Sequence, residues 1–386
     1  MSFSVMLIAG EASGDLYGAH LARALLALDP SIEVFGIGGW RMAEAGVELV
    51  YRSEDLACMG FVEVGTRFLT IRRIFRGTVT LLKERRPHLL IPIDYPGFNL
   101  RLSGMARSMG IPVLYYISPK VWAWGKWRIT QIISSVSKLI VVLPFEMDVY
   151  QGYPIEVIYP GHPLVDIVHA DISPEVFRRQ LGMTSDRPLV GLLPGSRRQE
   201  VIRILPTMLK TVALMEREVG TLHVTVGCVA DVERESYTKI VEREAIQAMM
   251  VEGKTYDLMA ASDLLLVASG TATLEATILG IPMVVLYRMA PLSYALARLV
   301  VGIPFISLPN LIARRGIVPE CIQGEMIPGQ VGAWGLRILN DVSERRRMID
   351  DLADVKGQLG SGGVSQRIAG IATLMIHERR LYDLPV

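Results

Sequence analysis

The segment at residues 263–287 constrains the fold of this chain more than any other. It opens with a short apolar run, residues 264–268, which is typical of a strand buried on both faces of a parallel sheet. Residues 271–279 then predict a short helix that ends at Gly280, and a second buried strand is expected at 283–287. A strand, a glycine turn, a helix and a further strand in this order indicate an α/β fold.

The first turn of this predicted helix offers a place for an anion. The N–H groups of Gly270, Thr271 and Ala272 have no partner within the helix, and the helix dipole favours a negative group such as a diphosphate there. Glu275 follows one turn later, where its carboxylate can accept hydrogen bonds from the two hydroxyls of a ribose. The alternative is an ordinary turn in which Glu275 faces solvent, and this segment alone does not decide between the two.

Similar apolar runs recur along the whole chain. We expect strands at 5–9, 32–37, 88–93, 113–117, 139–143, 157–159, 189–193, 222–226 and 249–251, with helices between them. A chain of 386 residues exceeds the usual size of one core, so we predict two doubly wound, Rossmann-like α/β domains. We place them at 1–163 and 164–358, divided by a rigid Pro-Gly-His-Pro turn, with a C-terminal helical tail at 359–386.

Charge and composition argue against several classes of protein. A formal net charge of +1 provides no overall field that would attract nucleic acid, so no nucleic-acid partner is expected. The three cysteines form no metal-binding or disulfide spacing, which indicates a reducing compartment. No uncharged run is long enough for a membrane span, so we expect a protein that is soluble or attached only to a membrane surface.

A glycine-rich stretch at 36–39 resembles a dinucleotide-binding fingerprint. It follows the second predicted strand instead of the first, however, and it lacks the spacing to a third glycine. We therefore interpret it as a tight turn and expect neither a nicotinamide cofactor nor any other cofactor or metal ion.

The loop after the first predicted strand carries polar side chains. Glu11, Ser13 and Asp15 lie there between two glycines that would let a ligand approach the backbone closely. Capping of the next helix, which we expect at 16–28, would explain Asp15 but not Glu11. Ser13 and Asp15 are therefore candidates for contact with a ligand.

Asp94 is the first candidate for a general base. It follows the predicted strand at 88–93, and the carboxyl edge of a parallel sheet is where open α/β folds bind ligands. The Pro96-Gly97 turn directs Asp94 toward that edge instead of letting it cap the next helix cleanly. Glu11 is the competing candidate.

Two aromatic segments could contact lipid. The stretch at 59–86 interleaves arginines with apolar residues, among them Phe61, Phe68 and Phe75, as expected of a helix on an anionic membrane surface. A core-facing helix with a solvated arginine face explains the same pattern equally well. A second stretch contains three of the five tryptophans, and its Trp122 and Trp124 could stack on a sugar or an acyl chain, or fill a gap between helices.

A second anion-binding loop is predicted in the second half of the chain. Gly195, Ser196 and Arg197 follow the predicted strand at 189–193 and precede a long helix. The free N–H groups of a helix start together with one guanidinium are typical of a phosphate site.

Several ordered motifs make the sequence resemble the lipid-A-disaccharide synthase family, which is glycosyltransferase family 19 of the GT-B class. The resemblance runs nearly end to end. It rests on Gly10-Glu11 with Ser13-Gly14-Asp15, Asp94 with Pro96-Gly97-Phe98-Asn99, Ser118-Pro119 with Trp122-Ala123-Trp124, Leu143-Pro144-Phe145-Glu146, Gly161-His162-Pro163, Leu193-Pro194-Gly195-Ser196-Arg197, Ser269-Gly270-Thr271-Ala272 with Leu274-Glu275, and Pro309-Asn310.

The resemblance implies a reaction and its participants. A 2,3-diacylglucosamine group would pass from its UDP derivative to 2,3-diacylglucosamine 1-phosphate, with inversion, to form a β-1,6 disaccharide and UDP. Asp94 or Glu11 would be the base, and fixed donors would replace a divalent metal at the departing UDP. The UDP-sugar would contact Gly195, Ser196, Arg197, Ser269, Gly270, Thr271, Ala272, Glu275, Asn310 and Arg315. The acceptor and the acyl chains would contact Ser13, Asp15, Phe61, Phe68, Phe75, Trp122 and Trp124.

The resemblance also implies a cellular setting. The enzyme would be cytoplasmic and peripherally associated with the anionic inner membrane of a Gram-negative bacterium. A homodimer with exchanged C-terminal parts is expected, in which Asn310 and Arg315 complete the neighbouring subunit's site and the tail at 359–386 packs on the N-terminal domain or is exchanged.

Three other functions fit part of the pattern. A UDP-sugar 2-epimerase shares the fold and a UDP site but has no need of a basic, aromatic surface. A nucleotide-dependent dehydrogenase would require a proper glycine fingerprint after the first strand. A non-catalytic lipid carrier would leave the predicted UDP loops without a purpose.

Overall fold

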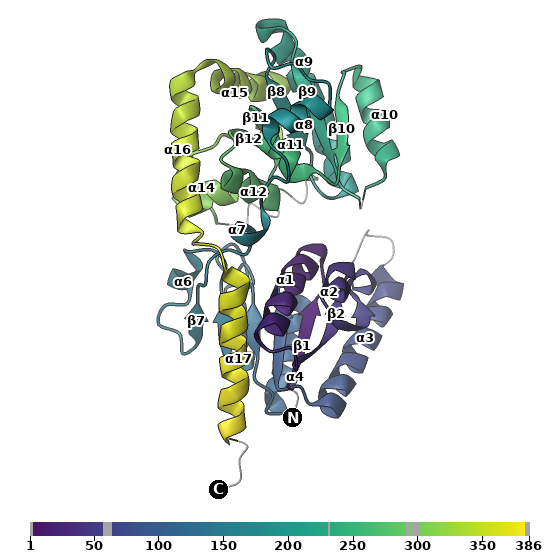
Figure 1. Ribbon diagram of the computed structural model, residues 1–386, viewed down its shortest axis with the longest axis vertical. Coiled ribbons are helices and arrows are strands. Elements are labelled where there is room, and N and C mark those ends of the chain that lie inside the picture. Colours follow the sequence, from purple (N-terminus) through teal and green to yellow (C-terminus); the bar gives the residue numbers. More distant parts are fainter. Residues whose placement is uncertain (1–2, 57–63, 231, 291–293, 295–301, 383–386) are drawn as a thin grey trace. The chain divides into compact units, whose positions relative to one another are not determined.

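Parallel strands form two separate sheets in the computed structural model, which describes residues 3–56, 64–230, 232–290, 294 and 302–382, with the backbone alone at 64–68 and 379–382. Each sheet belongs to its own compact unit (Figure 1). Unit 1 consists of residues 1–166 and 359–386, and unit 2 of residues 167–358. The two Rossmann-like α/β domains that the sequence predicts are therefore confirmed as the fold.

Unit 1 contains a seven-stranded parallel sheet in the order β3-β2-β1-β4-β5-β6-β7. The chain adds strands outward from β1 in one direction and then from β4 in the other, so the order reverses between β1 and β4. The elements are β1 Ser4–Ala9, α1 Ala12–Leu28, β2 Glu33–Gly38, α2 Trp40–Glu44, β3 Glu48–Arg52, η1 Ser53–Asp55, α3 Val64–Arg85, β4 Leu89–Ile93, α4 Pro96–Ser108, β5 Leu114–Tyr116, α5 Arg128–Ser135, β6 Lys138–Ile140, α6 Glu146–Val149, β7 Glu156–Ile158, α7 Leu164–Ile167 at the boundary with unit 2, and α17 Val364–Tyr382.

Glycines bring β1 and β2 close together. A Cβ at Gly36 would collide with the carbonyl oxygen of Leu7 on the paired strand, so only glycine fits there. The prediction of a tight turn at 36–39 is wrong for its first three residues, because β2 continues to Gly38. Gly39 alone separates β2 from α2.

The first helix begins earlier than predicted. We expected it near Leu16, but α1 begins at Ala12, with Glu11 as its N-cap residue in extended conformation. The polar residues that we assigned to a loop, Ser13 and Asp15, therefore lie in the first turn of α1. The expected strand 139–143 is also shorter, since β6 ends at Ile140.

The C-terminal helix α17 completes unit 1. Its buried side chains recur at helical spacing, and it packs against α1 (Figure 1). The carboxylate of Asp166 accepts hydrogen bonds from the backbone N–H groups of Gly363, Val364 and Ser365 at 2.7, 2.8 and 3.3 Å, which satisfies the free donors at the start of α17. The glycine break predicted between the last two helices lies directly before these donors.

Unit 2 contains a six-stranded parallel sheet in the order β10-β9-β8-β11-β12-β13, with the same reversal between β8 and β11. Its elements are α8 Pro174–Gln180, β8 Leu189–Leu193, α9 Arg198–Val219, β9 His223–Cys228, α10 Arg234–Glu244, β10 Met249–Glu252, α11 Thr255–Ala261, β11 Leu264–Ala268, α12 Thr271–Leu279, β12 Met283–Tyr287, α14 Leu308–Ala313, β13 Glu320–Ile322, η3 Gln323–Glu325, α15 Pro328–Asn340 and α16 Val342–Gln358. The segment from which the sequence analysis began is thus β11, α12 and β12.

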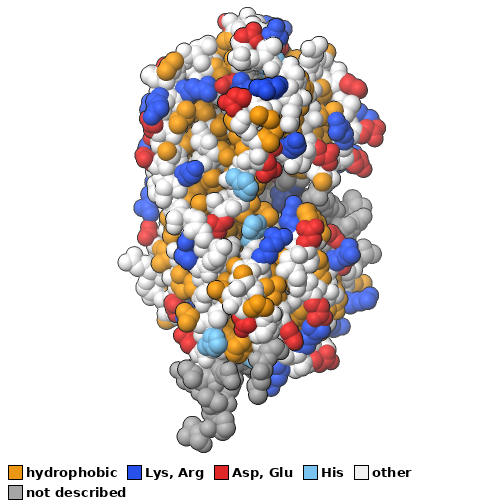
Figure 2. Space-filling model, in the orientation of Figure 1, with side chains coloured by type: hydrophobic (Ala, Val, Ile, Leu, Met, Phe, Trp, Pro, Cys, Tyr) orange, Lys and Arg blue, Asp and Glu red, His pale blue; other side chains and the backbone are white. Residues whose placement is uncertain are grey.

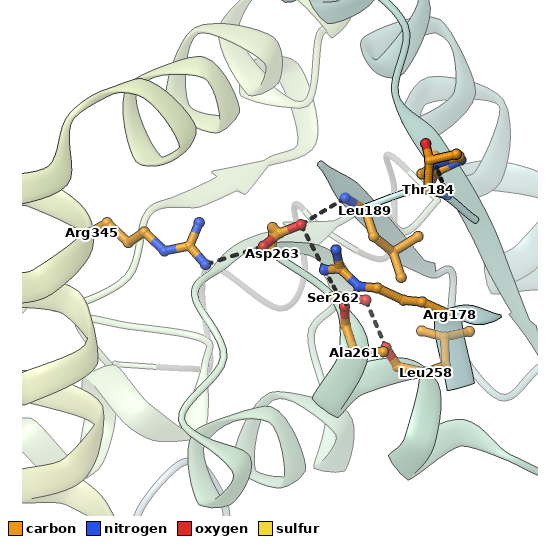
Figure 3. Close-up of polar contacts among 9 residues, drawn as sticks. Arg178, Thr184, Leu189, Leu258, Ala261, Ser262, Asp263 and Arg345 are labelled. Atoms are coloured by element: carbon orange, nitrogen blue, oxygen red, sulfur yellow. Dashed lines mark hydrogen bonds and ion pairs between the residues drawn. The ribbon is translucent and has the colours of Figure 1, made fainter. Parts of the chain in front are cut away.

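Asp263 joins four elements of unit 2 (Figure 3). One of its oxygens accepts hydrogen bonds from Arg178 of α8 at 2.7 Å and from the backbone N–H of Leu189 at 2.8 Å, and the other lies 3.5 Å from Arg345 of α16. Arg178 also donates twice to the carbonyl of Ala261. These bonds fasten α8 and α16 to the amino ends of β8 and β11.

The surface carries charges of both signs. Figure 2 shows basic and acidic side chains interspersed on the visible face of each unit, in keeping with the formal net charge of +1. Within the described ranges, no helix combines the length and the apolar character that crossing a membrane requires.

Candidate functional site

The carboxyl edge of the unit 1 sheet brings Glu11 and Asp94 to neighbouring strands. Ala9 of β1 pairs with Ile93 of β4, and each candidate residue follows its strand within two positions. The reversal of strand order lies between these two strands, and open α/β sheets bind their ligands at such a point. The two predicted bases, Glu11 and Asp94, therefore lie on either side of the point where the strand order of unit 1 reverses.

The backbone of Asp94 is held in an uncommon conformation. Asp94 and Tyr95 have φ values of 45° and 48°, in the left-handed region that non-glycine residues rarely adopt. The carbonyl of Asp94 accepts hydrogen bonds from the Asn99 amide and from the Tyr115 hydroxyl, each at 2.7 Å, and its N–H donates to Tyr116. Strain that the surroundings enforce in this way is a feature of functional sites.

The side chain of Asp94 is electrostatically unusual. Burial raises its pKa to about 6, the charge of Lys120 lowers it, and the nearby Glu11 raises it. The hydrogen bonds from Asn99 and Tyr115 go to the backbone carbonyl of Asp94. Its carboxylate is hydrogen-bonded by the backbone of Tyr95, which lowers the pKa, but burial still makes it more basic than an ordinary aspartate. Glu11 is exposed.

Asp15 is committed to the structure of unit 1. It is only 2% exposed, and it accepts hydrogen bonds from the N–H groups of Gly39, Met42 and Arg41 at 2.7, 3.0 and 3.2 Å. It therefore holds the start of α2 instead of capping the helix that it belongs to. This geometry does not support the predicted contact of Asp15 with the acceptor, whereas Ser13 is exposed in the first turn of α1.

The two aromatic segments differ in exposure. Phe61 lies outside the described residues, and Phe68 is described by its backbone alone. Phe75 packs edge-on against Phe98 at 5.3 Å and joins the core of unit 1, so its predicted contact with lipid is not supported. From residue 71 onward, α3 matches the alternative of a core-facing helix with a solvated arginine face. Its exposed apolar residue is Leu69, at 64%.

The tryptophan segment is partly exposed. Trp122 is half-buried, and its indole N–H donates to Glu146 at 3.0 Å. Trp124 is 44% exposed and Trp127 is 68% exposed, and the guanidinium of Arg128 lies over both rings at 4.2 and 5.0 Å. Both predicted tryptophans thus follow β5, the strand next to β4.

In unit 2, the loop after β8 already holds a carboxylate. The N–H groups of Ser196 and Arg197 donate to Glu200 at 3.0 and 3.2 Å, and Gly195, with φ of 115°, lies against the same side chain. The guanidinium of Arg197 is 72% exposed and lies 3.4 Å from Glu200. The backbone donors of Ser196 and Arg197 are therefore occupied here, and the donor that this loop presents to solvent is the Arg197 guanidinium, which is exposed although it is paired with Glu200.

The start of α12 lies beside that loop, because β8 and β11 are paired neighbours. Gly270 and Thr271 are exposed at the helix start, and Ser269 donates its hydroxyl to the carbonyl of Ile306 at 3.0 Å. Ala272 is partly exposed in the same turn. The two predicted anion-binding loops thus meet at the point where the strand order of unit 2 reverses.

Glu275 has a partner that sequence reasoning missed. The hydroxyl of Tyr256, from α11, donates to one Glu275 oxygen at 3.2 Å. Burial raises the pKa of Glu275 to about 6, and the Tyr256 hydrogen bond lowers it. Tyr256 follows a different strand, β10, so no sequence spacing links it to Glu275.

Asn310 and Arg315 are engaged within their own unit. Asn310 is 1% exposed, donates to Val318 and Glu320, and accepts from the N–H groups of Ile317 and Val318. These bonds use its amide fully, which does not support a direct contact with a ligand. Arg315 is 56% exposed and forms a bidentate pair with Asp351 at 2.6 and 3.1 Å.

A pocket of about 580 Å³ lies elsewhere in unit 2. Arg178, Asp263 and Arg345 line it, so it belongs to the network in Figure 3 at the amino ends of the strands. Among the described residues, no group of three or more His, Cys, Asp or Glu side chains could hold a metal ion. The residues with candidate chemistry are therefore those at the carboxyl edges.

The chain is similar to known proteins over nearly its whole length. A family model described as lipid-A-disaccharide synthetase matches residues 5–362. A lipid-A-disaccharide synthase from Trichlorobacter lovleyi is 39% identical over 374 residues, covering 97% of this chain and 98% of that protein. One from Myxococcus xanthus is 38% identical over 365 residues, covering 95% of each. The chain belongs to the lipid-A-disaccharide synthase family.

Membership of the lipid-A-disaccharide synthase family confirms the resemblance that the motifs predicted. The chain is therefore a glycosyltransferase of lipid A biosynthesis. The family match covers parts of both units and ends just before α17 begins.

Solved structures of more distant proteins share the fold. The Staphylococcus aureus MnaA–UDP structure has a TM-score of 0.68 at 12% identity, with 99% of each chain covered. The Neisseria meningitidis UDP-GlcNAc 2-epimerase bound to UDP-GlcNAc has a TM-score of 0.62 at 12% identity, covering 97% of this chain and 100% of that one. The calicheamicin glycosyltransferase CalG4 has a TM-score of 0.61 at 13% identity, covering 97% and 98%. The predicted GT-B fold is confirmed.

The raised pKa values predict an unusual response to mutation. Asp94 and Glu275 both titrate near pH 6 in the folded chain, against about 4 in an unfolded one, so the folded protein loses stability as pH rises from about 4 to about 6. Asp94→Asn and Glu275→Gln should therefore each increase the free energy of unfolding at pH 8 by roughly 1–3 kcal/mol, and the gain should vanish below pH 4. Urea unfolding at the two pH values measures this.

Asp15→Asn is the matched control. Its carboxylate is satisfied by three backbone N–H groups, so this variant should lose roughly 1–3 kcal/mol at pH 8. If Asp94→Asn and Glu275→Gln lose stability as Asp15→Asn does, their carboxylates are structural.

Proposed function

We propose that the chain transfers 2,3-diacylglucosamine from its UDP derivative to 2,3-diacylglucosamine 1-phosphate, with inversion, to form the β-1,6 disaccharide 1-phosphate and UDP. The observation that carries this proposal is Asp94, a carboxylate clamped in a strained turn with a pKa of about 6, in a member of the lipid-A-disaccharide synthase family. The resemblance supplies the substrates, and the geometry supplies a base that suits their chemistry.

Inversion needs a base at the acceptor hydroxyl. An α-linked donor that yields a β-linked product requires one in-line displacement, in which the hydroxyl loses its proton as it attacks. A base with a pKa of about 6 is ionised at neutral pH and takes a proton more readily than an ordinary aspartate, whose pKa is near 4. Asp94 therefore fits this role better than the exposed Glu11.

The departing UDP needs stabilisation of its charge. We assign the diphosphate to the start of α12 and to the guanidinium of Arg197, which lie on paired strands of unit 2. A diphosphate that used the backbone of the neighbouring loop as well would have to displace Glu200. Glu275, oriented by Tyr256, is assigned to the ribose hydroxyls. Two solved structures of distant proteins with the same fold are complexes, one with UDP and one with UDP-GlcNAc.

A UDP-sugar 2-epimerase is the second candidate, because the Neisseria meningitidis protein that shares this fold is a UDP-GlcNAc 2-epimerase bound to UDP-GlcNAc. An epimerase acts on the UDP-sugar alone, whereas the proposed transfer releases UDP only when the lipid acceptor is present. Incubation of the acylated UDP-sugar with and without acceptor separates the two functions.

The first prediction here concerns Asp94. Asp94→Asn keeps the size of the side chain but cannot take a proton, so turnover should fall by about 10²–10⁴ while UDP binding stays nearly unchanged. The measurement is UDP release with acceptor present. Glu11→Gln is the comparison: if that variant loses its rate and Asp94→Asn keeps it, Glu11 is the base.

A further prediction concerns Arg197. Arg197→Ala removes the exposed guanidinium at the start of α9 and should weaken UDP binding by roughly 1.5–3 kcal/mol, measured by calorimetry. Arg198→Ala removes the same charge one residue later, inside the helix, and should have a smaller effect. Equal affinities in both variants would exclude Arg197 from the donor site.

Attachment to an anionic membrane surface is proposed for the arginine face of α3. Leu69 is 64% exposed, and Arg72, Arg73 and Arg76 are exposed on the same helix. Apolar and cationic side chains together favour an interface with anionic lipid. Two further parts of this proposal rest on the family resemblance. They are the location of the protein on the cytoplasmic side of an inner membrane and a homodimer with exchanged C-terminal parts.

The corresponding prediction uses the exposed Leu69 in place of Phe75, which packs against the core. Leu69→Ser combined with Arg72→Gln and Arg73→Gln should release the protein from vesicles that contain anionic lipid, because both contributions to binding are reduced. Sedimentation with vesicles measures this, and Arg243→Gln with Arg346→Gln serves as a control for lost charge elsewhere. If the triple variant sediments with vesicles as the parent does, α3 does not bind the membrane and serves only in packing.

A further inference from the structure

The loop after β5 begins next to Asp94. Ile93 of β4 pairs with Tyr116 of β5, and the N–H of Asp94 donates to the carbonyl of Tyr116 at 2.9 Å. Ile117 then turns the chain with a φ of 70°, and its N–H donates to Ile140 of β6. Residues 117–127, the tryptophan loop, therefore start at the same edge of the sheet as Asp94.

Two buried contacts fasten this loop to the body of unit 1. The hydroxyls of Ser118 and Tyr150 are 2.6 Å apart, and the indole N–H of Trp122 donates to Glu146 at 3.0 Å. Glu146 is 2% exposed, and its second oxygen accepts from the N–H groups of Val142 and Leu143 at 3.1 and 3.0 Å. A buried carboxylate that is bound by three donors fixes the position of what it binds.

Lys120 lies on the fastened part of the loop, between Ser118 and Trp122. Its backbone carbonyl accepts from the N–H groups of Ala123 and Trp124 at 3.1 and 3.2 Å, which closes a turn around it. Residues 95–145 contain no Asp or Glu, so the carboxylates at the two ends of this stretch, Asp94 and Glu146, are the ones that this part of the chain offers to Lys120.

The electrostatics agree with this placement. Burial raises the pKa of Asp94 to about 6 and that of Glu146 to about 7, and the positive charge of Lys120 lowers both. Besides Lys120, the charge of Glu11 at the start of α1 acts on Asp94 and raises its pKa. Tyr115 of β5 is a neutral neighbour of Asp94. Around Glu146 the titratable neighbours are the hydroxyls of Tyr150 and Tyr159.

We propose that Lys120 is a further functional residue of this enzyme: its ammonium group, positioned by the Glu146–Trp122 hydrogen bond, keeps Asp94 ionised and ready to accept the proton of the acceptor hydroxyl. Lys120 and Glu146 act through Asp94 and are positioning residues. The proposal rests on the proposed function in one respect, the use of Asp94 as the base.

The first test is the pH dependence of kcat/KM in Lys120→Met. Without the ammonium group the pKa of Asp94 rises, and the acid limb moves to higher pH. A rise of about half to one unit lowers kcat/KM at pH 6 by about two- to fivefold, with the alkaline plateau retained. Glu11→Gln removes the charge that raises the pKa of Asp94, so its acid limb should move to lower pH.

Lys126→Met is the matched control, because Lys126 is an exposed lysine on the same loop that does not perturb Asp94. Its acid limb should coincide with that of the parent. If Lys120→Met shifts no more than Lys126→Met, the proposal is overturned. If Lys120→Met instead raises only the KM for the acceptor, Lys120 binds the acceptor phosphate and the proposal is likewise overturned.

A second measurement is independent of activity. The carboxyl carbon of Asp94 can be followed by ¹³C NMR in aspartate-labelled protein and assigned by its loss in Asp94→Asn. Its titration should move to higher pH in Lys120→Met and, by a smaller step, in Glu146→Gln and Trp122→Phe, which loosen the loop. The Trp122 variant removes only the indole donor and so serves if Glu146→Gln does not fold.

The two measurements separate the two hypotheses. A shifted Asp94 titration together with normal turnover of Asp94→Asn would show that Lys120 does act on Asp94 but that Asp94 is not the base. An unshifted titration in Lys120→Met would overturn the proposal whatever the activity shows.

Discussion

Parallel pairing between β1 and β4, and between β8 and β11, is the constraint on which the rest of the structure depends. In each unit the chain builds strands outward from one member of the pair and then outward from the other. The loops after these two strands must therefore leave the sheet side by side, since their helices depart in opposite directions. Glu11 with Asp94, and Arg197 with Gly270, are brought together by this topology although they are far apart in sequence.

The acidic residues of the chain fall into two groups that burial alone does not distinguish. Asp15, Asp166 and Asp263 bind backbone N–H groups or arginines and hold elements together. Asp94 and Glu275 are held by their surroundings, yet burial raises the pKa of each to about 6. A raised pKa alone does not identify a catalytic group, because burial raises the pKa of Glu146 to about 7 although that carboxylate holds Trp122 in place. Asp94 and Glu275 carry the proposed chemistry because they also follow the carboxyl ends of β4 and β11.

Much of the fold could be predicted from the sequence, because buried parallel strands are continuous apolar runs and glycines mark their ends. The runs at 264–268 and 283–287 are observed as β11 and β12 with the predicted bounds. The start of α1 was predicted four residues late. Glu11 and Ser13 are typical of a loop, but Glu11 occupies the N-cap position of α1 in extended conformation and Ser13 lies in the first turn. β3 and β13 were missed because they are short and only partly buried.

The site was harder to predict than the fold, because hydrogen-bond partners across elements leave no spacing in the sequence. Asn310 resembles a ligand contact, yet its amide is used entirely by Val318, Ile317 and Glu320. Tyr256 and Glu146 show the opposite case. They bind Glu275 and Trp122, and no sequence motif connects the two members of either pair. Phe75 belongs to a pattern that suits lipid and core equally, and its contact with Phe98 supports packing against the core.

The capping of α17 by Asp166 has a consequence for how the chain is made. Residues 359–386 complete unit 1, although all of unit 2 is translated between the two parts of that unit. Until then α1 lacks the helix that packs against it. The nascent protein thus carries an uncovered face of unit 1 while unit 2 is made, when a chaperone or a second nascent chain could bind it. Loss of α17 would harm unit 1 more than unit 2.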